Sequence, residues 1–290
     1  MKYSYYPGCS LCSTASEYNL SSEAICEQLG IQLKEIPDWN CCGATSAHSA
    51  SAYLAVALPL RNLILAEKMG LDMVVPCAAC YHWQRVAHQE VVTGTAIGKK
   101  ANQELGDIIG ASYNGNLQVK HIMEVMLQQQ VLELLPKKIT KPLKGMKLAS
   151  YYGCLMLRPA EVVAIDNPEQ PDSIDKMAQA LGASTVRWSS KVDCCGGSFT
   201  LAESGVVDKL TFDIVSAARR GGADAIVTAC PLCQANLDTR QKENDEQMPV
   251  FYITELIGVA LGMSESRQWF KKHIVNPLPL LERFNLLKKG

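Results

Sequence analysis

Hydrophobic and polar positions divide the chain into short apolar runs and longer stretches with helical spacing. The short runs are rich in aromatic and β-branched residues, and they predict strands at residues 2–6, 32–36, 73–75, 147–152 and 225–228. The longer stretches predict helices at residues 16–29, 49–69 and 207–220. Pro59 predicts a kink or a split in the second of these helices. Strands that alternate with helices predict an α/β fold with small parallel sheets flanked by helices.

The chain contains one cysteine pattern twice. Three motifs recur in the same order, and 34 residues separate the second cysteine of the Cys-Cys pair from the Cys-x-x-Cys motif in both copies. The first two motifs are 31 residues apart in one copy and 39 in the other. The first copy, called here the first cysteine set, has Cys9, Cys41-Cys42-Gly43 and Cys77-Ala78-Ala79-Cys80. The second cysteine set has Cys154, Cys194-Cys195-Gly196 and Cys230-Pro231-Leu232-Cys233.

Other landmarks also repeat. A tyrosine pair precedes the first cysteine of each set, and we align Tyr5-Tyr6 with Tyr151-Tyr152. His121 to Glu124 matches Tyr252 to Glu255. The duplication predicts two tandem, pseudo-symmetric, Rossmann-like domains, residues 1–140 and 141–290. Their connector is expected at residues 136–147, which contain two prolines, a glycine and five lysines.

Composition limits the function classes. Of 290 residues, 28 are Lys or Arg and 29 are Asp or Glu, so the net charge of −1 argues against nucleic-acid binding driven by bulk charge. The longest run without these four residue types, residues 39–60, is too polar to cross a bilayer. No apolar segment of a signal peptide follows Lys2. We therefore expect a cytoplasmic protein in which thiols stay reduced.

The cysteines of the first set follow the carboxyl ends of three predicted strands, and the second half has the same order of elements. Those ends share one edge of a parallel sheet, so five thiols are expected to converge in each copy. Disulfides are disfavoured by a reducing compartment and by the strain of bridging adjacent cysteines. A structural zinc ion uses four ligands and leaves one thiol over, and a thioredoxin-like dithiol uses only two. An iron–sulfur cluster offers several irons and uses all five thiols.

The pattern Cys, Cys-Cys-Gly, Cys-x-x-Cys is similar to the CCG-domain signature. Two copies in one chain resemble HdrB, the CCG-domain subunit of heterodisulfide reductase, in a bacterial-type branch, over about residues 2–241. The local runs that carry this resemblance begin at Asp38, Val75 and Ala229. It implies one noncubane [4Fe-4S] cluster per set. The ligands would be Cys9, Cys41, Cys42, Cys77 and Cys80 for one cluster, and Cys154, Cys194, Cys195, Cys230 and Cys233 for the other.

The resemblance also implies an activity and partners. The two clusters would reductively cleave a small-molecule or protein-bound disulfide between them, or oxidise two thiols in reverse. Electrons would come from an HdrC-like iron–sulfur subunit and an HdrA-like flavin subunit, because this chain has no nucleotide fingerprint and no ferredoxin-like cysteine run. The alternatives are an electron-relay CCG subunit of a lactate- or glycolate-type dehydrogenase and a zinc-stabilised scaffold.

Several other residues are weaker candidates. His48, His82 and His121 are candidate proton donors near the cysteine motifs, although a structural role is the commoner one for a lone histidine. Cys12 and Cys26 have no counterpart in the second copy. We expect Cys26 to be a small buried apolar residue and Cys12 to be a bystander.

Overall fold

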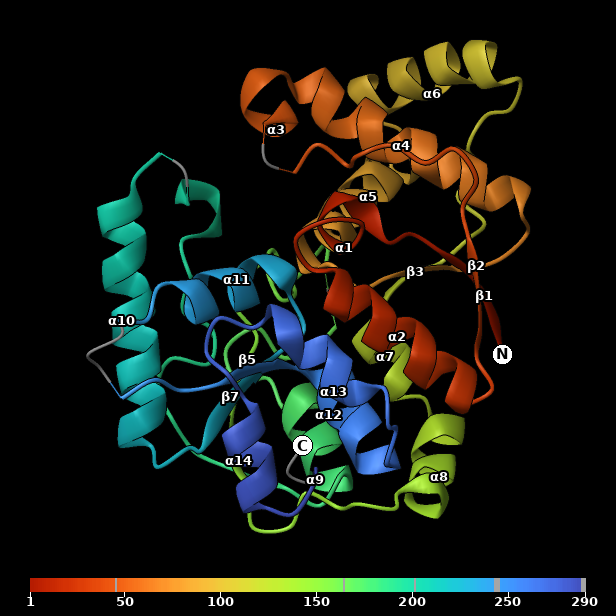
Figure 1. The fold of residues 1–290 in the computed structure, drawn as a ribbon. Coiled ribbons are helices and arrows are strands. Elements are labelled where there is room, and N and C mark those ends of the chain that lie inside the picture. The colour runs from red at the N-terminus through yellow and green to blue at the C-terminus, as the bar shows by residue number, and fades with distance from the viewer. Residues whose placement is uncertain (45, 164, 201, 243–245, 288–290) are drawn as a thin grey trace.

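Two four-stranded parallel sheets organise the chain (Figure 1). A computed structural model describes residues 1–44, 46–163, 165–200, 202–242 and 246–287. The strand order is β2-β1-β3-β4 in the first sheet and β6-β5-β7-β8 in the second, so the two halves of the chain share one topology. The strands are β1 (Lys2–Tyr5), β2 (Gln32–Glu35), β3 (Met73–Val75), β4 (Val119–His121), β5 (Lys147–Tyr151), β6 (Ser184–Thr185), β7 (Ala225–Thr228) and β8 (Val250–Tyr252).

Helices connect and flank these strands. In the first half they are α1 (Gly8–Leu11), α2 (Ser16–Gln28), α3 (Ala47–Ala50), α4 (Ala52–Lys68), α5 (Ala78–Val92), α6 (Ala96–Ile109), α7 (Ile122–Met126) and α8 (Gln129–Lys138). In the second half they are α9 (Ser173–Ala180), η1 (Gly197–Phe199), α10 (Ser204–Arg220), α11 (Pro231–Thr239), α12 (Ile253–Leu261), α13 (Ser266–Trp269), η2 (Phe270–Lys272) and α14 (Leu278–Arg283). In the described part of the chain, no helix is long and apolar enough to cross a membrane.

The five predicted strands and the parallel α/β fold are confirmed. Two local predictions are wrong. The break in the helical stretch near residue 50 lies at Ser51 and not at Pro59, because Ser51 is extended and its hydroxyl accepts the Leu54 N–H as the N-cap of α4. The connector begins later than expected, because α8 continues through Pro136 to Lys138.

The two halves of the chain pack against each other through helices from both. Each half sends the helix after its fourth strand against the first long helix of the other half, so that α7 packs on α9 and α12 packs on α2. Figure 1 shows α2 lying beside α12 and α13. The Tyr18 ring of α2 stacks on the Tyr252 ring with centroids 4.1 Å apart, and the Ser21 and Thr254 hydroxyls are 2.7 Å apart. One hydrophobic core therefore runs through both halves.

The segment after α12 packs back on the second half. Asp238 of α11 accepts the backbone N–H groups of Ile274 and Val275 at 2.7 and 3.1 Å. His273 lies beside the fully buried Glu255, with Nε2 2.9 Å from Oε1. This segment has no counterpart in the first half, and α13 also packs on α2 of the first half.

Candidate functional site

The structure brings the five thiols of the first set together at the carboxyl edge of the first sheet. Cys41 Sγ lies 3.7 Å from Cys9 Sγ, and Cys42 Sγ lies 3.3 Å from Cys80 Sγ. Cys77 hydrogen-bonds the Cys80 thiol, and Cys42 hydrogen-bonds that of Cys41. The expected convergence is therefore found, and every thiol of the set touches another.

The second set repeats this arrangement around a small cavity of about 70 Å³. Cys195 Sγ lies 3.6 Å from Cys233 Sγ, and Cys154 hydrogen-bonds Cys194. All five thiols line the cavity, together with Ala78, Tyr152, Leu155, Gly197, Ser198 and Leu232. The second set is therefore a ready-made pocket walled almost entirely by sulfur and apolar groups.

Helix starts hold the Cys-x-x-Cys motifs. Cys77 is the N-cap of α5 and Cys230 is the N-cap of α11, so Cys80 and Cys233 lie in the first turns of these helices. A hydrogen bond from Cys233, together with N–H groups at the helix start, lowers the pKa of Cys230. Hydrogen bonds to neighbouring cysteines and burial raise the pKa of Cys80 and Cys233.

A glycine before the first cysteine allows each set to close. Gly8 has φ +72° and Gly153 has φ +64°, a region that L-residues with side chains rarely adopt. A Cβ on Gly8 would lie 2.9 Å from Cys80 Sγ, and a Cβ on Gly153 would lie 2.9 Å from Cys233 Sγ. The same backbone approach to a thiol is therefore built into both halves.

The tyrosines before these glycines correct the alignment made from sequence. Tyr6 donates its hydroxyl to the carbonyl before Cys41 at 2.8 Å, and Tyr151 donates to the carbonyl before Cys194 at 2.7 Å. Tyr6 is thus the equivalent of Tyr151. Pro7 is then the equivalent of Tyr152, because each is the single residue between the matched tyrosine and Gly8 or Gly153. The second half therefore has a tyrosine at a position where the first has a proline.

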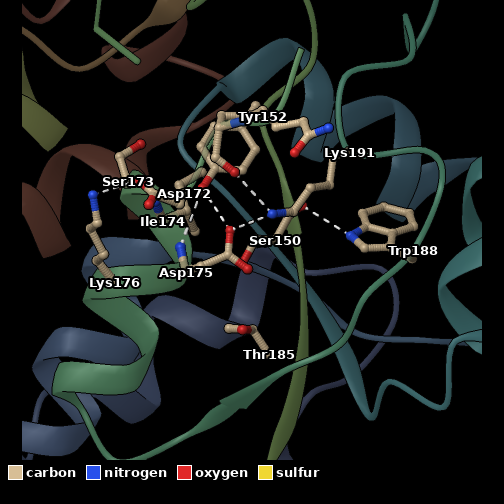
Figure 2. A network of polar contacts seen from close by, with 12 residues as sticks. Ser150, Tyr152, Asp172, Ser173, Ile174, Asp175, Lys176, Thr185, Trp188 and Lys191 are labelled. Atoms are coloured by element: carbon tan, nitrogen blue, oxygen red, sulfur yellow. Dashed lines mark hydrogen bonds and ion pairs between the residues drawn. The ribbon is translucent and has the colours of Figure 1, made fainter. Parts of the chain in front are cut away.

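Figure 2 shows the network that this tyrosine makes. The Tyr152 hydroxyl donates to Asp175 Oδ2 at 2.8 Å and accepts the Ile174 N–H at 2.8 Å. Lys191 Nζ lies 2.7 Å from the same carboxylate oxygen, and the Lys191 carbonyl accepts the Tyr152 N–H at 2.9 Å. The network fastens the strand end before Cys154 to the loop before Cys194.

The first thiol of each adjacent pair is favoured as a thiolate. Hydrogen bonds from the Cys42 and Cys9 thiols, and from the Gly43 N–H, lower the pKa of Cys41. A hydrogen bond from Cys154, with the N–H groups of Gly196 and Gly197, lowers the pKa of Cys194 to about 6. The pKa of Cys9 is raised because it donates to Cys41 and is partly buried. Each set thus contains thiolate acceptors and thiol donors side by side.

The two sets are direct neighbours. The N–H of Ala78, one residue after Cys77, hydrogen-bonds the Cys230 thiol of the other half. The same Ala78 lines the cavity of the second set. The arrangement places two sulfur-lined centres on either side of the line where the halves meet.

Comparison with known proteins agrees with this duplication. The model of the family described as CCG, cysteine-rich domain, matches residues 3–84 and 148–238. The chain belongs to the CCG family. Both matched segments contain a complete cysteine set of this CCG protein.

Relatives match nearly the whole length of the chain. An 8-methylmenaquinol:fumarate reductase membrane anchor subunit of Wolinella succinogenes is 32% identical, over 96% of this chain and 99% of the relative. The HdrB subunit of a ferredoxin/F(420)H(2)-dependent CoB-CoM heterodisulfide reductase of Methanosarcina acetivorans is 27% identical, over 100% and 99%. An HdrB-like protein of Archaeoglobus profundus is 28% identical, over 92% and 93%. The resemblance to HdrB is thus confirmed.

One solved structure has the same fold. A hypothetical protein from Helicobacter pylori superposes with a TM-score of 0.71 at 11% identity, over 94% of this chain and 51% of the other. At that identity the likeness concerns the fold alone.

The chemistry of the donors fits a sulfur-ligated polynuclear group in each CCG repeat. Each set gathers five thiols, and thiolates are the soft ligands that iron–sulfur clusters take. Because Gly8 and Gly153 have no Cβ, no side chain from these two positions crowds the thiols of Cys80 and Cys233. Among the described residues, no group of three or more His, Cys, Asp or Glu side chains is arranged to hold a single metal ion.

The other sequence candidates lie apart from the sets or have structural contacts. His48 is exposed and stacks on Trp83 with centroids 5.0 Å apart. Burial lowers the pKa of His82. Burial also lowers the pKa of His121, to about 4, and its Nδ1 accepts the Met123 N–H as the N-cap of α7. Cys26 is buried, as expected, and Cys12 is exposed.

Sequence reasoning missed Tyr18. Its hydroxyl lies between the two Cys-x-x-Cys loops, 211 residues away from one of its partners. The repeat gave no signal for it, because α9 is shorter than α2 at its N-terminal end. With the helix ends at Leu29 and Leu181 matched, α9 has no residue in the position of Tyr18.

Proposed function

We propose that each cysteine set holds one noncubane [4Fe-4S] cluster and that this chain is the iron–sulfur subunit of a heterodisulfide reductase-like complex. The ligands would be Cys9, Cys41, Cys42, Cys77 and Cys80, and Cys154, Cys194, Cys195, Cys230 and Cys233. The observation that carries the proposal is the duplicated set of five mutually touching thiols, with the two sets adjacent through Ala78 and Cys230. The HdrB relatives support it.

The reaction is the reductive cleavage of a disulfide. Two electrons and two protons convert one S–S bond into two thiols, and the reverse direction oxidises two thiols. The clusters would supply electrons one at a time at two neighbouring points. Electrons would enter from an HdrC-like iron–sulfur subunit, itself fed by an HdrA-like flavin subunit.

The chain's own residues have defined tasks in this scheme. The N–H groups of Gly43 and Gly196 stabilise the thiolate form of Cys41 and Cys194. The apolar wall of Leu155 and Leu232 limits water at the second set. Tyr6 and Tyr151 hold the loops of the adjacent cysteines against the strand ends.

A second candidate function is supported by the relative from Wolinella succinogenes. That protein is named as a subunit of a quinol:fumarate reductase, and it is 32% identical to this chain. The two sets would then relay electrons between partner subunits without acting on a disulfide, as in the CCG subunits of lactate- or glycolate-type dehydrogenases. We place the boundary between the two repeats near residue 140, and the protein in the cytoplasm, as parts of the same proposal.

Metal analysis of the chain, purified without oxygen, tests the clusters. The proposal expects about eight iron and eight sulfide per chain for two four-iron clusters. Cys42→Ser and Cys195→Ser should each lose about half of the iron, whereas Cys26→Ser is the matched control at a buried cysteine outside the sets. About two zinc ions and no sulfide would instead show a zinc-stabilised scaffold.

Disulfide turnover with a reduced viologen dye distinguishes the two redox functions. Cleavage that needs both sets is expected for the reductase. A chain with full iron content that passes electrons from the dye to a partner subunit, but cleaves no disulfide tested, would favour the relay.

A further inference from the structure

One buried hydroxyl joins the loops of both Cys-x-x-Cys motifs. The Tyr18 hydroxyl lies 3.1 Å from the Pro76 carbonyl oxygen and 3.2 Å from that of Ala229. Pro76 immediately precedes Cys77, and Ala229 immediately precedes Cys230. A single donor therefore bridges the two chain segments that lead into the two cysteine sets.

A second side chain faces the same two carbonyls. His121 Nδ1 accepts the Met123 N–H at 3.2 Å, so the ring proton of the neutral imidazole resides on Nε2. That Nε2 is fully buried and has no hydrogen-bond partner among the described residues, and the carbonyls of Pro76 and Ala229 are the acceptors near it. Tyr18 on α2 and His121 at the end of β4 thus lie beside the same pair of carbonyls, and Tyr18 makes the hydrogen bonds to them.

The surroundings make this junction rigid. Tyr18 is completely buried, and its ring lies parallel to that of Tyr252, with an interplanar angle of 1°. The Ala78 N–H donates to the Cys230 thiol across the same line. Side chains in a close-packed interior move little, so the two loops cannot separate without breaking these bonds.

We propose that Tyr18, supported by His121, is a positioning residue that fixes the separation of the two cysteine centres. The inference rests on the proposed two-centre cleavage of a disulfide, in which both centres act on one S–S bond and their separation must match it. Tyr18 touches no substrate in this role. It acts through the backbone of Pro76 and Ala229.

The test compares Tyr18→Phe with Ser21→Ala in the full chain, purified without oxygen. Ser21 is three residues away on α2. Its buried hydroxyl bonds Thr254 at 2.7 Å and the Tyr18 carbonyl at 3.2 Å, and among the described residues it makes no hydrogen bond to either cysteine loop. The first readout is hydrogen exchange, by mass spectrometry, of residues 76–80 and 229–233 in the metal-free chain. Tyr18→Phe should speed exchange in both loops, and Ser21→Ala should leave both unchanged.

The second readout uses the iron-loaded chain. Tyr18→Phe should keep its iron, change the magnetic interaction between the two centres in electron paramagnetic resonance, and lower disulfide cleavage by about 10²-fold. His121→Asn is the second variant, because its amide oxygen preserves the cap on α7 while the Nε2 donor is lost. His121→Asn should likewise speed hydrogen exchange of both loops, change the magnetic interaction between the two centres and lower disulfide cleavage.

Unchanged exchange of both loops in Tyr18→Phe and His121→Asn would overturn the inference. Loosened loops with unchanged magnetic interaction and unchanged cleavage would overturn the positioning role. A wild-type chain that cleaves no disulfide would contradict the proposed function, and the exchange comparison would then show separately whether Tyr18 joins the loops.

Discussion

Replacing Gly8 by alanine adds one Cβ atom, which should disturb the packing of the first cysteine set. Gly8 has φ +72°, and an alanine Cβ there would lie 2.9 Å from Cys80 Sγ and 3.2 Å from a ring carbon of Tyr6. Gly30 is the matched control, because its φ is +71° and an added Cβ would meet nothing within 4 Å. The two substitutions therefore share the backbone strain and differ in the clash with the thiol.

The magnitudes separate the two effects. A left-handed conformation costs alanine about 1–2 kcal/mol, and this applies to both variants. Overpacking adds about 1–3 kcal/mol at Gly8 only. Gly8→Ala should therefore lower the free energy of unfolding by about 2–5 kcal/mol, a large share of the 5–15 kcal/mol typical of a folded protein.

The assay measures denaturant unfolding and iron content of both variants on protein purified without oxygen. Gly30→Ala should retain all its iron, whereas Gly8→Ala should lose about half of it, since only the first set is disturbed. If Gly8→Ala matched Gly30→Ala in both stability and iron, the Cys80 thiol would not lie against residue 8, and the geometry of the first set would be wrong.

The remaining predictions concern three charged or reactive groups. In the metal-free chain at neutral pH, iodoacetamide should alkylate Cys194 faster than Cys12, which is also exposed, because the pKa of Cys194 is lowered to about 6 and that of Cys12 is raised by burial; mass spectrometry that finds the reverse order contradicts this. Burial opposes protonation of His273, but its glutamate partner outweighs burial and raises the pKa to about 9. The stability from this pair should be complete below pH 6.5 and disappear as the pH rises through about 9, and His273→Gln should flatten that part of the unfolding profile. Lys191→Met leaves its partner aspartate uncompensated and should cost about 1–3 kcal/mol in denaturant unfolding, less than a fully buried pair. The loss of the exposed pair in Lys176→Met should cost much less, and equal losses would show that the Lys191 contact is not formed.

The sequence was sufficient wherever a short-range rule decides the outcome. Strand composition located β1, β3, β5 and β7, and the parallel arrangement then required the cysteines after those strands to meet. Ser51 is of a residue type that commonly caps helices, but the break was predicted at Pro59, eight residues later, because proline usually disrupts a helix interior. Pro59 stays within α4, which is held by its buried face against α5 and α6.

The parts that could not be predicted depend on contacts between the halves. Tyr18 looks like any apolar helix residue, and its partners follow it by 58 and 211 residues. The equivalence of Pro7 and Tyr152 was hidden because two tyrosine pairs align naturally by eye. Only the hydrogen bonds of Tyr6 and Tyr151 to matching carbonyls show which tyrosines correspond.

The crossed packing of α2 with α12 and of α7 with α9 bears on how such a chain could arise. A surface that pairs with a copy of itself around a twofold axis is isologous, and a single-repeat ancestor with these helices would have formed such a homodimer. In that homodimer every residue near the twofold axis would have occurred once in each subunit, so one side chain had to fit both symmetry-related environments. After fusion into one polypeptide, the two equivalent positions could mutate independently. Position 18 could then become a buried tyrosine while α9 of the second half became shorter and has no residue in that place, and an ancestral symmetric pair of centres could acquire one unsymmetrical junction.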